Sequence, residues 1–98
     1  MIAIEKEQLE IVRKILKKYV PKAEIRIFGS RYKHTNKEYS DIDIAIVQVD
    51  KIDIKLYSEM KEAFEESNLK YRVDLVEWNT ISEEFKKIIE EGYYRLEL

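Results

Sequence analysis

The chain has 98 residues, of which 45% are hydrophobic, and its 18 Lys and Arg against 20 Asp and Glu give a formal charge of −2. This length and apolar content predict one small domain with a compact core and exclude a disordered chain. No apolar run approaches the roughly 18 residues of a membrane-spanning helix, and the balanced charge argues against a surface that coats nucleic acid. The absence of cysteine and the single histidine exclude disulfide scaffolds, thiol catalysis and His-rich metal sites. Any chemistry must therefore come from carboxylates, hydroxyls, Lys and Arg side chains, and the backbone.

The first half of the chain predicts a helix followed by a strand. Apolar residues recur at three- and four-residue spacing over residues 4–20, which indicates an amphipathic helix that Pro21 ends. Isoleucines then alternate with charged residues over 23–28, a strand pattern. The polar and basic residues 31–40 predict a short helical turn and a loop.

The strongest strand signal covers residues 42–49. Its nearly continuous apolar run predicts a central strand buried on both faces, with one face formed by Ile42, Ile44 and Ile46. Asp53 can cap a helix over residues 54–66. A third strand is expected over residues 71–78.

The end of the chain predicts one more helix and a short edge strand. Thr80 and Glu83 have the spacing of a capping box, and Gly92 suits the position after the helix. The inward-facing side chains would be Phe85, Ile88 and Ile89. Residues 93–98 can add an edge strand. The element order predicts an α/β or α+β fold with a small mixed sheet flanked by helices.

A strand that ends in Gly29-Ser30 with a helical turn behind it suggests an anion site. Free backbone N–H groups at such a turn point at a bound anion, and glycine allows close approach to the backbone. Ser30 adds a hydroxyl, and Arg31 and Lys33 add positive charge. This pattern is typical of a phosphate or triphosphate cradle. Taken alone, the Gly-Ser pair would be interpreted as an ordinary turn.

Three acids in the following part of the chain suggest a metal site beside this anion site. Asp41 and Asp43 are two residues apart at the start of a strand, so their carboxylates point the same way. Asp74 interrupts the apolar run of the next strand, where an unpaired carboxylate is costly unless a metal or partner compensates it. Carboxylates and phosphate oxygens are the ligands that Mg²⁺ prefers, and such sites serve nucleotidyl transfer. The alternative to a metal-binding role for Asp74 is that it is an ordinary acid on an edge strand. We interpret His34 as a solvated loop residue and Trp78 as a core residue.

These motifs resemble the minimal nucleotidyltransferases (MNT) of the DNA polymerase β superfamily, and most closely the MNT antitoxins encoded beside an all-helical HEPN toxin. The resemblance extends from the first helix to the last and is carried by Gly29-Ser30-Arg31, Asp41-Ile42-Asp43 and Val73-Asp74-Leu75-Val76. It implies a small nucleotidyltransferase palm, with a mixed three- to four-stranded sheet, as a single domain over residues 1–98. The implied activity is transfer of AMP from ATP to a protein hydroxyl, commonly a tyrosine of the HEPN partner.

The resemblance also implies a role for each motif residue. Gly29 and Ser30 would hold the triphosphate, and Arg31 would help to bind phosphate. The three acids would form the catalytic metal site. Asp41 and Asp43 would ligate Mg²⁺, and Asp74 would ligate a second metal ion or act as the general base.

Two other functions are compatible with the residues. A non-catalytic antitoxin would neutralise its partner by complex formation, with the acids as a relic or a structural metal site. A small-molecule nucleotidyltransferase would need an acceptor domain, for which the 98 residues show no sign. We therefore expect the acceptor surface to come from a second protein, with no membrane partner and no direct nucleic-acid binding. The absence of an apolar leader at the first residues predicts a cytoplasmic location.

Overall fold

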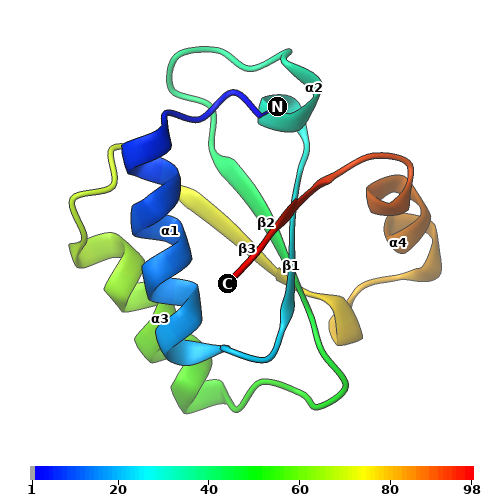
Figure 1. The fold of residues 1–98 in the computed structure, drawn as a ribbon. Coiled ribbons are helices and arrows are strands. Elements are labelled where there is room, and N and C mark those ends of the chain that lie inside the picture. Colours follow the sequence, from blue (N-terminus) through cyan, green and yellow to red (C-terminus); the bar gives the residue numbers. More distant parts are fainter. Residues whose placement is uncertain (1) are drawn as a thin grey trace.

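Four strands form one mixed sheet in the order β3-β2-β1-β4 in a computed structural model that describes residues 2–98 (Figure 1). The central strands β1 and β2 are antiparallel, β1 is also antiparallel to β4, and β2 is parallel to β3. The strands are β1 (Glu24–Phe28), β2 (Ile42–Val47), β3 (Val73–Glu77) and β4 (Tyr94–Leu96). The mixed sheet and the edge strand expected near residues 93–98 are both confirmed.

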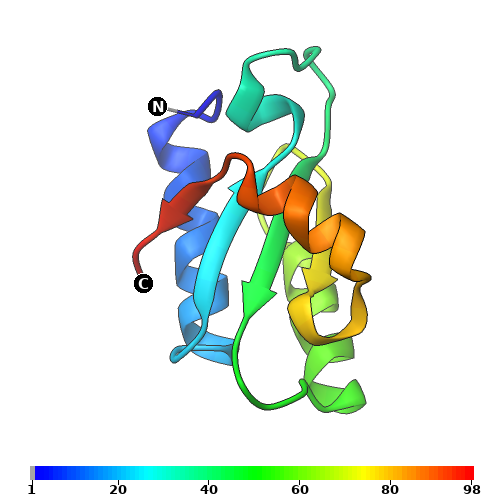
Figure 2. The same ribbon diagram turned by 90° about the vertical axis from the view of Figure 1, so that its right-hand side faces the viewer.

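Helices cover the two faces of the sheet unequally. They are α1 (Lys6–Tyr19), α2 (Ser30–Lys33), α3 (Ile54–Glu66) and α4 (Glu83–Glu90), with a 3₁₀ turn η1 (Trp78–Thr80) before the last. Figure 2 shows α4 in front of the sheet and the long helices α1 and α3 behind it. Of the helices within residues 2–98, none is long and apolar enough to cross a membrane.

Strand β2 is the centre of the core, as the sequence predicts. Its residues Ile42, Ile44 and Ile46 are fully buried on the face covered by α1 and α3, where they pack with Leu16 and Met60. On the opposite face Ala45 is also fully buried and packs with Phe28 and Ile89. A strand enclosed on both faces needs apolar side chains on both, which explains its unbroken hydrophobic run.

Helix α3 begins as predicted and α4 does not. The carboxylate of Asp53 accepts hydrogen bonds from the backbone N–H groups of Lys55 (3.1 Å) and Leu56 (3.4 Å), which caps α3. The capping box assigned to Thr80 is wrong, because residues 78–80 form η1 and the Thr80 hydroxyl donates to the Glu77 carbonyl (2.8 Å). The cap of α4 is instead Ser82, whose hydroxyl accepts from the Phe85 N–H at 3.1 Å.

The buried stripe of α4 is narrower than expected. Phe85 and Ile89 are four residues apart and face the sheet, whereas Ile88 is 55% exposed. The prediction that Ile88 faces inward is therefore wrong, because the row directed at the sheet is that of Phe85 and Ile89, and Ile88 lies beside this row. Gly92 follows the end of the helix as expected. A Cβ atom there would lie 2.7 Å from the Tyr32 ring, so tight packing favours glycine.

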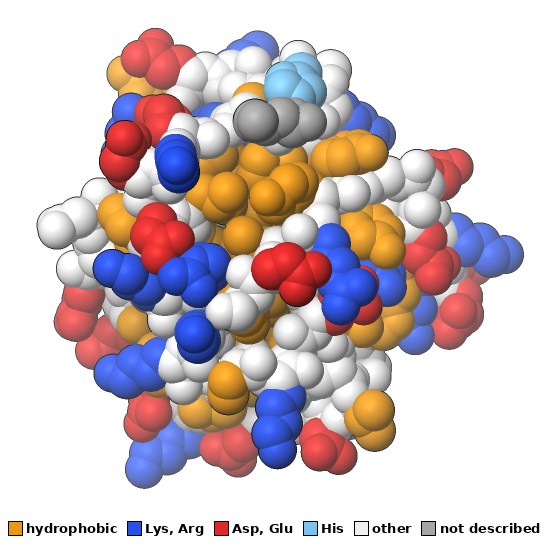
Figure 3. All heavy atoms as spheres, in the orientation of Figure 1, with side chains coloured by type: hydrophobic (Ala, Val, Ile, Leu, Met, Phe, Trp, Pro, Cys, Tyr) orange, Lys and Arg blue, Asp and Glu red, His pale blue; other side chains and the backbone are white. Residues whose placement is uncertain are grey.

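Both signs of charge are interspersed over the face of the molecule drawn in Figure 3, around a hydrophobic area near its centre. This distribution agrees with the formal charge of −2.

Candidate active site

Gly29 and Asp43 lie against each other at one end of the sheet. Gly29 follows β1 and begins α2 with φ 78° and ψ −152°, a conformation open almost only to glycine. The last residue of β1, Phe28, pairs with Asp43 in the β1–β2 ladder. A Cβ atom on Gly29 would therefore come within 2.3 Å of Asp43 Oδ2. The turn that carries Ser30 is thus built directly against the carboxylate.

The three predicted acids come to the same end of β2 and β3. In the parallel ladder Asp43 pairs with Asp74, so the two side chains project from one face of neighbouring strands about 4.8 Å apart. By strand alternation this is the face of Ala45, on which α4 lies. Asp41 is exposed and lies one residue before β2, whereas Asp43 is half-buried.

Burial and the neighbouring acids together raise the pKa of Asp43. The pKa of Asp43 rises from an ordinary 3.8 to about 6, first because it is buried and then because Asp74 and Asp41 repel its negative charge. A cation placed among the carboxylates would relieve this repulsion, so the donor set fits a hard divalent ion. Within residues 2–98 no three acidic or histidine side chains stand close enough to hold a metal ion unaided. Phosphate oxygens would therefore have to supply part of the ligand set.

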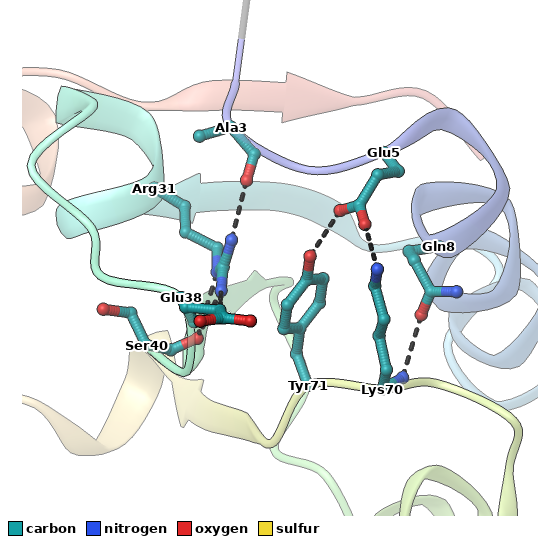
Figure 4. A network of polar contacts seen from close by, with 8 residues as sticks. All are labelled: Ala3, Glu5, Gln8, Arg31, Glu38, Ser40, Lys70 and Tyr71. Carbon is teal, nitrogen blue, oxygen red and sulfur yellow. Dashed lines mark hydrogen bonds and ion pairs between the residues drawn. The ribbon is translucent and has the colours of Figure 1, made fainter.

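The side chain of Arg31 is buried, with only 2% of the residue exposed. Its guanidinium donates to the carbonyls of Ser40 (Nε 3.0 Å, Nη2 2.9 Å), Ala3 (Nη1 2.8 Å) and Glu38 (Nη2 3.3 Å), as Figure 4 shows. It also lies over the Tyr71 ring, 3.8 Å from the centroid. These contacts differ from the phosphate-binding role expected for Arg31. The structure gives the guanidinium an internal, structural position.

Tyr71 extends this arrangement to the N-terminal residues. Its hydroxyl donates to the Glu5 carboxylate, which also forms an ion pair with Lys70 (Figure 4). The hydrogen bonds from Lys70 and Tyr71 lower the Glu5 pKa from 4.5 to about 2. Gln8 accepts a hydrogen bond from the Lys70 backbone N–H at 2.9 Å. No sequence signal marks these residues as a group, because they are about 65 positions apart in the chain.

The remaining singled-out side chains lie around the site. His34 ends α2 in a left-handed conformation (φ 59°), its backbone N–H bonded to the Ser30 carbonyl, and it is exposed, as is Lys33. Trp78 is half-buried against the cluster of Phe28, which agrees with the predicted core position. Sequence reasoning missed Arg26, which lies between the rings of Trp78 and Tyr93, 4.8 and 4.5 Å from their centroids.

A family model described as Polymerase beta, Nucleotidyltransferase matches residues 10–94, which include the Gly-Ser turn and all three acids. The chain belongs to this family. Its relatives in the family include a curated Haemophilus influenzae protein named "Probable protein adenylyltransferase MntA". That protein is 46% identical over 90 residues, which cover 92% of this chain and 79% of the relative.

Solved structures of the same fold agree with this membership of the polymerase beta nucleotidyltransferases. A crystal structure of a toxin–antitoxin with AMP-PNP matches with a TM-score of 0.75 at 28% identity, over 89% of this chain and 70% of the matched chain. A re-refined structure of the tri-AMPylated Shewanella oneidensis HEPN toxin in complex with MNT antitoxin matches with a TM-score of 0.70 at 26% identity, over 94% and 71%. The predicted family and the small nucleotidyltransferase fold are therefore confirmed.

Proposed function

We propose that this polymerase beta nucleotidyltransferase transfers AMP from ATP to a tyrosine hydroxyl of a HEPN toxin and so acts as its antitoxin. The proposal rests on one observation above all, the contact of Gly29 with Asp43 beside Asp74. A glycine turn built against paired carboxylates supports this proposal, because backbone N–H groups suited to a phosphate would then lie next to carboxylates suited to a cation. The relatives support the AMP transfer and the toxin partner, since one is named a protein adenylyltransferase and another is an MNT antitoxin in complex with an AMPylated toxin.

The triphosphate would bind at the start of α2. There the backbone N–H groups after Gly29 and the hydroxyl of Ser30 are the available donors, because the Arg31 guanidinium is occupied elsewhere. The structure with AMP-PNP among the relatives supports ATP as the nucleotide. Positioning of the phosphates is the main contribution that the turn makes to the rate.

The carboxylates would hold Mg²⁺ and receive the acceptor proton. Asp41 and Asp43 are the proposed magnesium ligands, and the ion supplies charge neutralisation for the phosphates when bound. Asp74 is exposed on the edge strand β3, so an acceptor from outside can reach it. It ligates a second metal ion or takes the proton of the acceptor hydroxyl. The hydroxyl oxygen forms the new bond to the α-phosphorus, and the bond to the β-phosphate breaks to release pyrophosphate.

Transfer of label from α-³²P-ATP to the purified cognate HEPN protein in the presence of Mg²⁺ tests the reaction. Asp43→Asn should abolish labelling, whereas Asp50→Asn, an exposed loop acid beyond the far end of β2, should not change it. Equal labelling by the wild type and Asp43→Asn would contradict the mechanism. Full neutralisation of the toxin by unlabelled complexes with Asp43→Asn would identify a binding antitoxin instead.

A further inference from the structure

We propose that Arg31 is a positioning residue that sets the separation between the Ser30 turn and Asp41. This inference rests on the proposed function, because it concerns the two halves of the same nucleotide and metal site. Arg31 is the one charged side chain among the buried residues of the part of the chain described. A buried guanidinium is stable only if its donors are satisfied, so its hydrogen bonds determine its role.

Arg31 closes the connector between the two halves of the site. It directly follows Ser30, and two of its hydrogen bonds go to the carbonyl of Ser40, which directly precedes Asp41. A third goes to Glu38 in the same connector. One side chain thereby joins the two ends of a ten-residue segment, much of it exposed, that contains no other regular element after α2. Local hydrogen bonds also join Lys37 to Ser40 and Thr35 to Ser30 within the connector, but it is the Arg31 side chain that joins its two ends.

The same guanidinium also reaches the segment that leads into β3, the strand that carries the third acid. It stacks on the Tyr71 ring at 3.8 Å, and the adjacent Arg72 carbonyl accepts the Ile42 N–H at 2.9 Å. These contacts lie at the start of both β2 and β3. Arg31 therefore contacts, or lies next to, the segments that lead into all three acids.

The N-terminal residues hold Arg31 in place from the other side. Ala3 accepts from Nη1 at 2.8 Å, and its N–H donates to the Arg31 carbonyl at 2.9 Å. Glu5 then bonds to Tyr71, under the guanidinium (Figure 4). Only arginine has a planar fork of five donors that can serve three carbonyls at once, so lysine cannot replace it.

The matched experiment compares Arg31→Lys with Arg13→Lys. Arg13 is half-buried, makes three hydrogen bonds and ties the Leu98 carbonyl to α1, away from the Gly29–Asp43 contact. The first measurement is hydrogen exchange of the backbone amides over residues 38–42 in the free protein. The second is Mn²⁺ affinity in the presence of AMP-PNP, by electron paramagnetic resonance. The third separates kcat from KM for ATP in the labelling reaction.

Arg31→Lys should speed exchange over residues 38–42 and weaken Mn²⁺ binding or lower kcat by about 10- to 100-fold, as supporting residues of metal sites do. Arg13→Lys should lower the melting temperature without either effect. If Arg31→Lys does not fold, Tyr71→Leu replaces it, with Tyr71→Phe as the control that keeps the ring.

A folded Arg31→Lys with wild-type exchange, Mn²⁺ affinity and kcat would overturn the inference. A wild-type protein that bound no Mn²⁺ with AMP-PNP would contradict the proposed function itself, and the positioning role with it. The two failures are distinguishable because the second is already visible without any substitution.

Discussion

Oδ2 of Asp43 occupies the space in which any side chain on Gly29 would begin, 2.3 Å from the ideal Cβ position. The two residues are 14 positions apart in the chain, at the end of β1 and near the start of β2, yet each restricts which residue can occupy the other position. The glycine leaves room for the carboxylate, and the carboxylate lies beside the turn that we propose holds the triphosphate. The contact predicts how substitutions at either position will behave.

Gly29→Ala should abolish nucleotidyl transfer and destabilise the fold. The new Cβ would clash with Asp43, and the backbone conformation at φ 78° is strained for alanine by about 1–3 kcal/mol. Thermal unfolding and the labelling assay measure the two effects.

A double substitution separates the clash from the backbone strain. The Asp43→Ala substitution removes the carboxylate atoms nearest to Gly29. Gly29→Ala should therefore cost less stability when it is made in the Asp43→Ala variant than when it is made in the wild type. Additive free energies of unfolding would show that the two side chains do not interfere.

Asp43→Asn should make the protein more stable at neutral pH while removing its activity. The folded-state pKa of Asp43 is about 6 against an ordinary 3.8, so the folded protein holds this proton more tightly than the unfolded chain does. The contribution of Asp43 to the stability of the wild type therefore falls as pH rises from about 4 to about 6 and stays lower above that. Asparagine carries no charge and avoids this loss.

The difference between the two melting temperatures checks this prediction. The melting temperature of the variant should exceed that of the wild type at pH 8 but not at pH 4. Added Mg²⁺ with nucleotide should raise the melting temperature of the wild type only. A difference that is the same at both pH values would assign the effect to something other than ionisation. Asp50→Asn serves as the surface control.

Ile89→Ala should cost about 2–5 kcal/mol, because a fully buried side chain leaves a cavity between α4 and the sheet. Ile88→Ala, one residue away and 55% exposed, should change stability by less than about 0.5 kcal/mol. Chemical denaturation of the two variants compares neighbouring isoleucines that sequence reasoning treated alike. Equal losses would contradict the orientation of α4.

Tyr71→Leu should destabilise the protein more than Tyr71→Phe. Leucine removes the ring beneath the buried Arg31 guanidinium, an interaction of about 2 kcal/mol when desolvated. Phenylalanine keeps the ring and removes only the exposed hydrogen bond to Glu5. Denaturant unfolding of both variants tests the order, and the reverse order would indicate that the hydroxyl matters more than the ring.

Local patterns predicted most of this fold. Alternation and apolar runs located β1 and β2, and the cap at Asp53 gave α3 its first residue. The spacing of Gly29 and the acids led to the family that the comparisons confirm. These features depend on residues close in sequence, or on a motif whose spacing reflects its chemistry.

Long-range contacts explain what was missed. Whether Ile88 or Ile89 faces the core depends on how α4 sits on the sheet, and the cap of α4 lies at Ser82 because η1 occupies residues 78–80. The guanidinium of Arg31 looked available because it follows the Gly-Ser pair, but its partners Ala3 and Tyr71 are 28 and 40 positions away. Nothing in the local sequence distinguishes an arginine that faces a ligand from one that faces the core.

The raised pKa of Asp43 has an evolutionary consequence. If a neutral residue at position 43 makes the folded state more stable, then selection for stability alone favours losing this carboxylate. A chain selected only for folding would therefore be expected to lose the Asp43 carboxylate. The acid can persist only under selection for what the site does, so a homologue that has turned into a purely binding protein should show its loss first at this position.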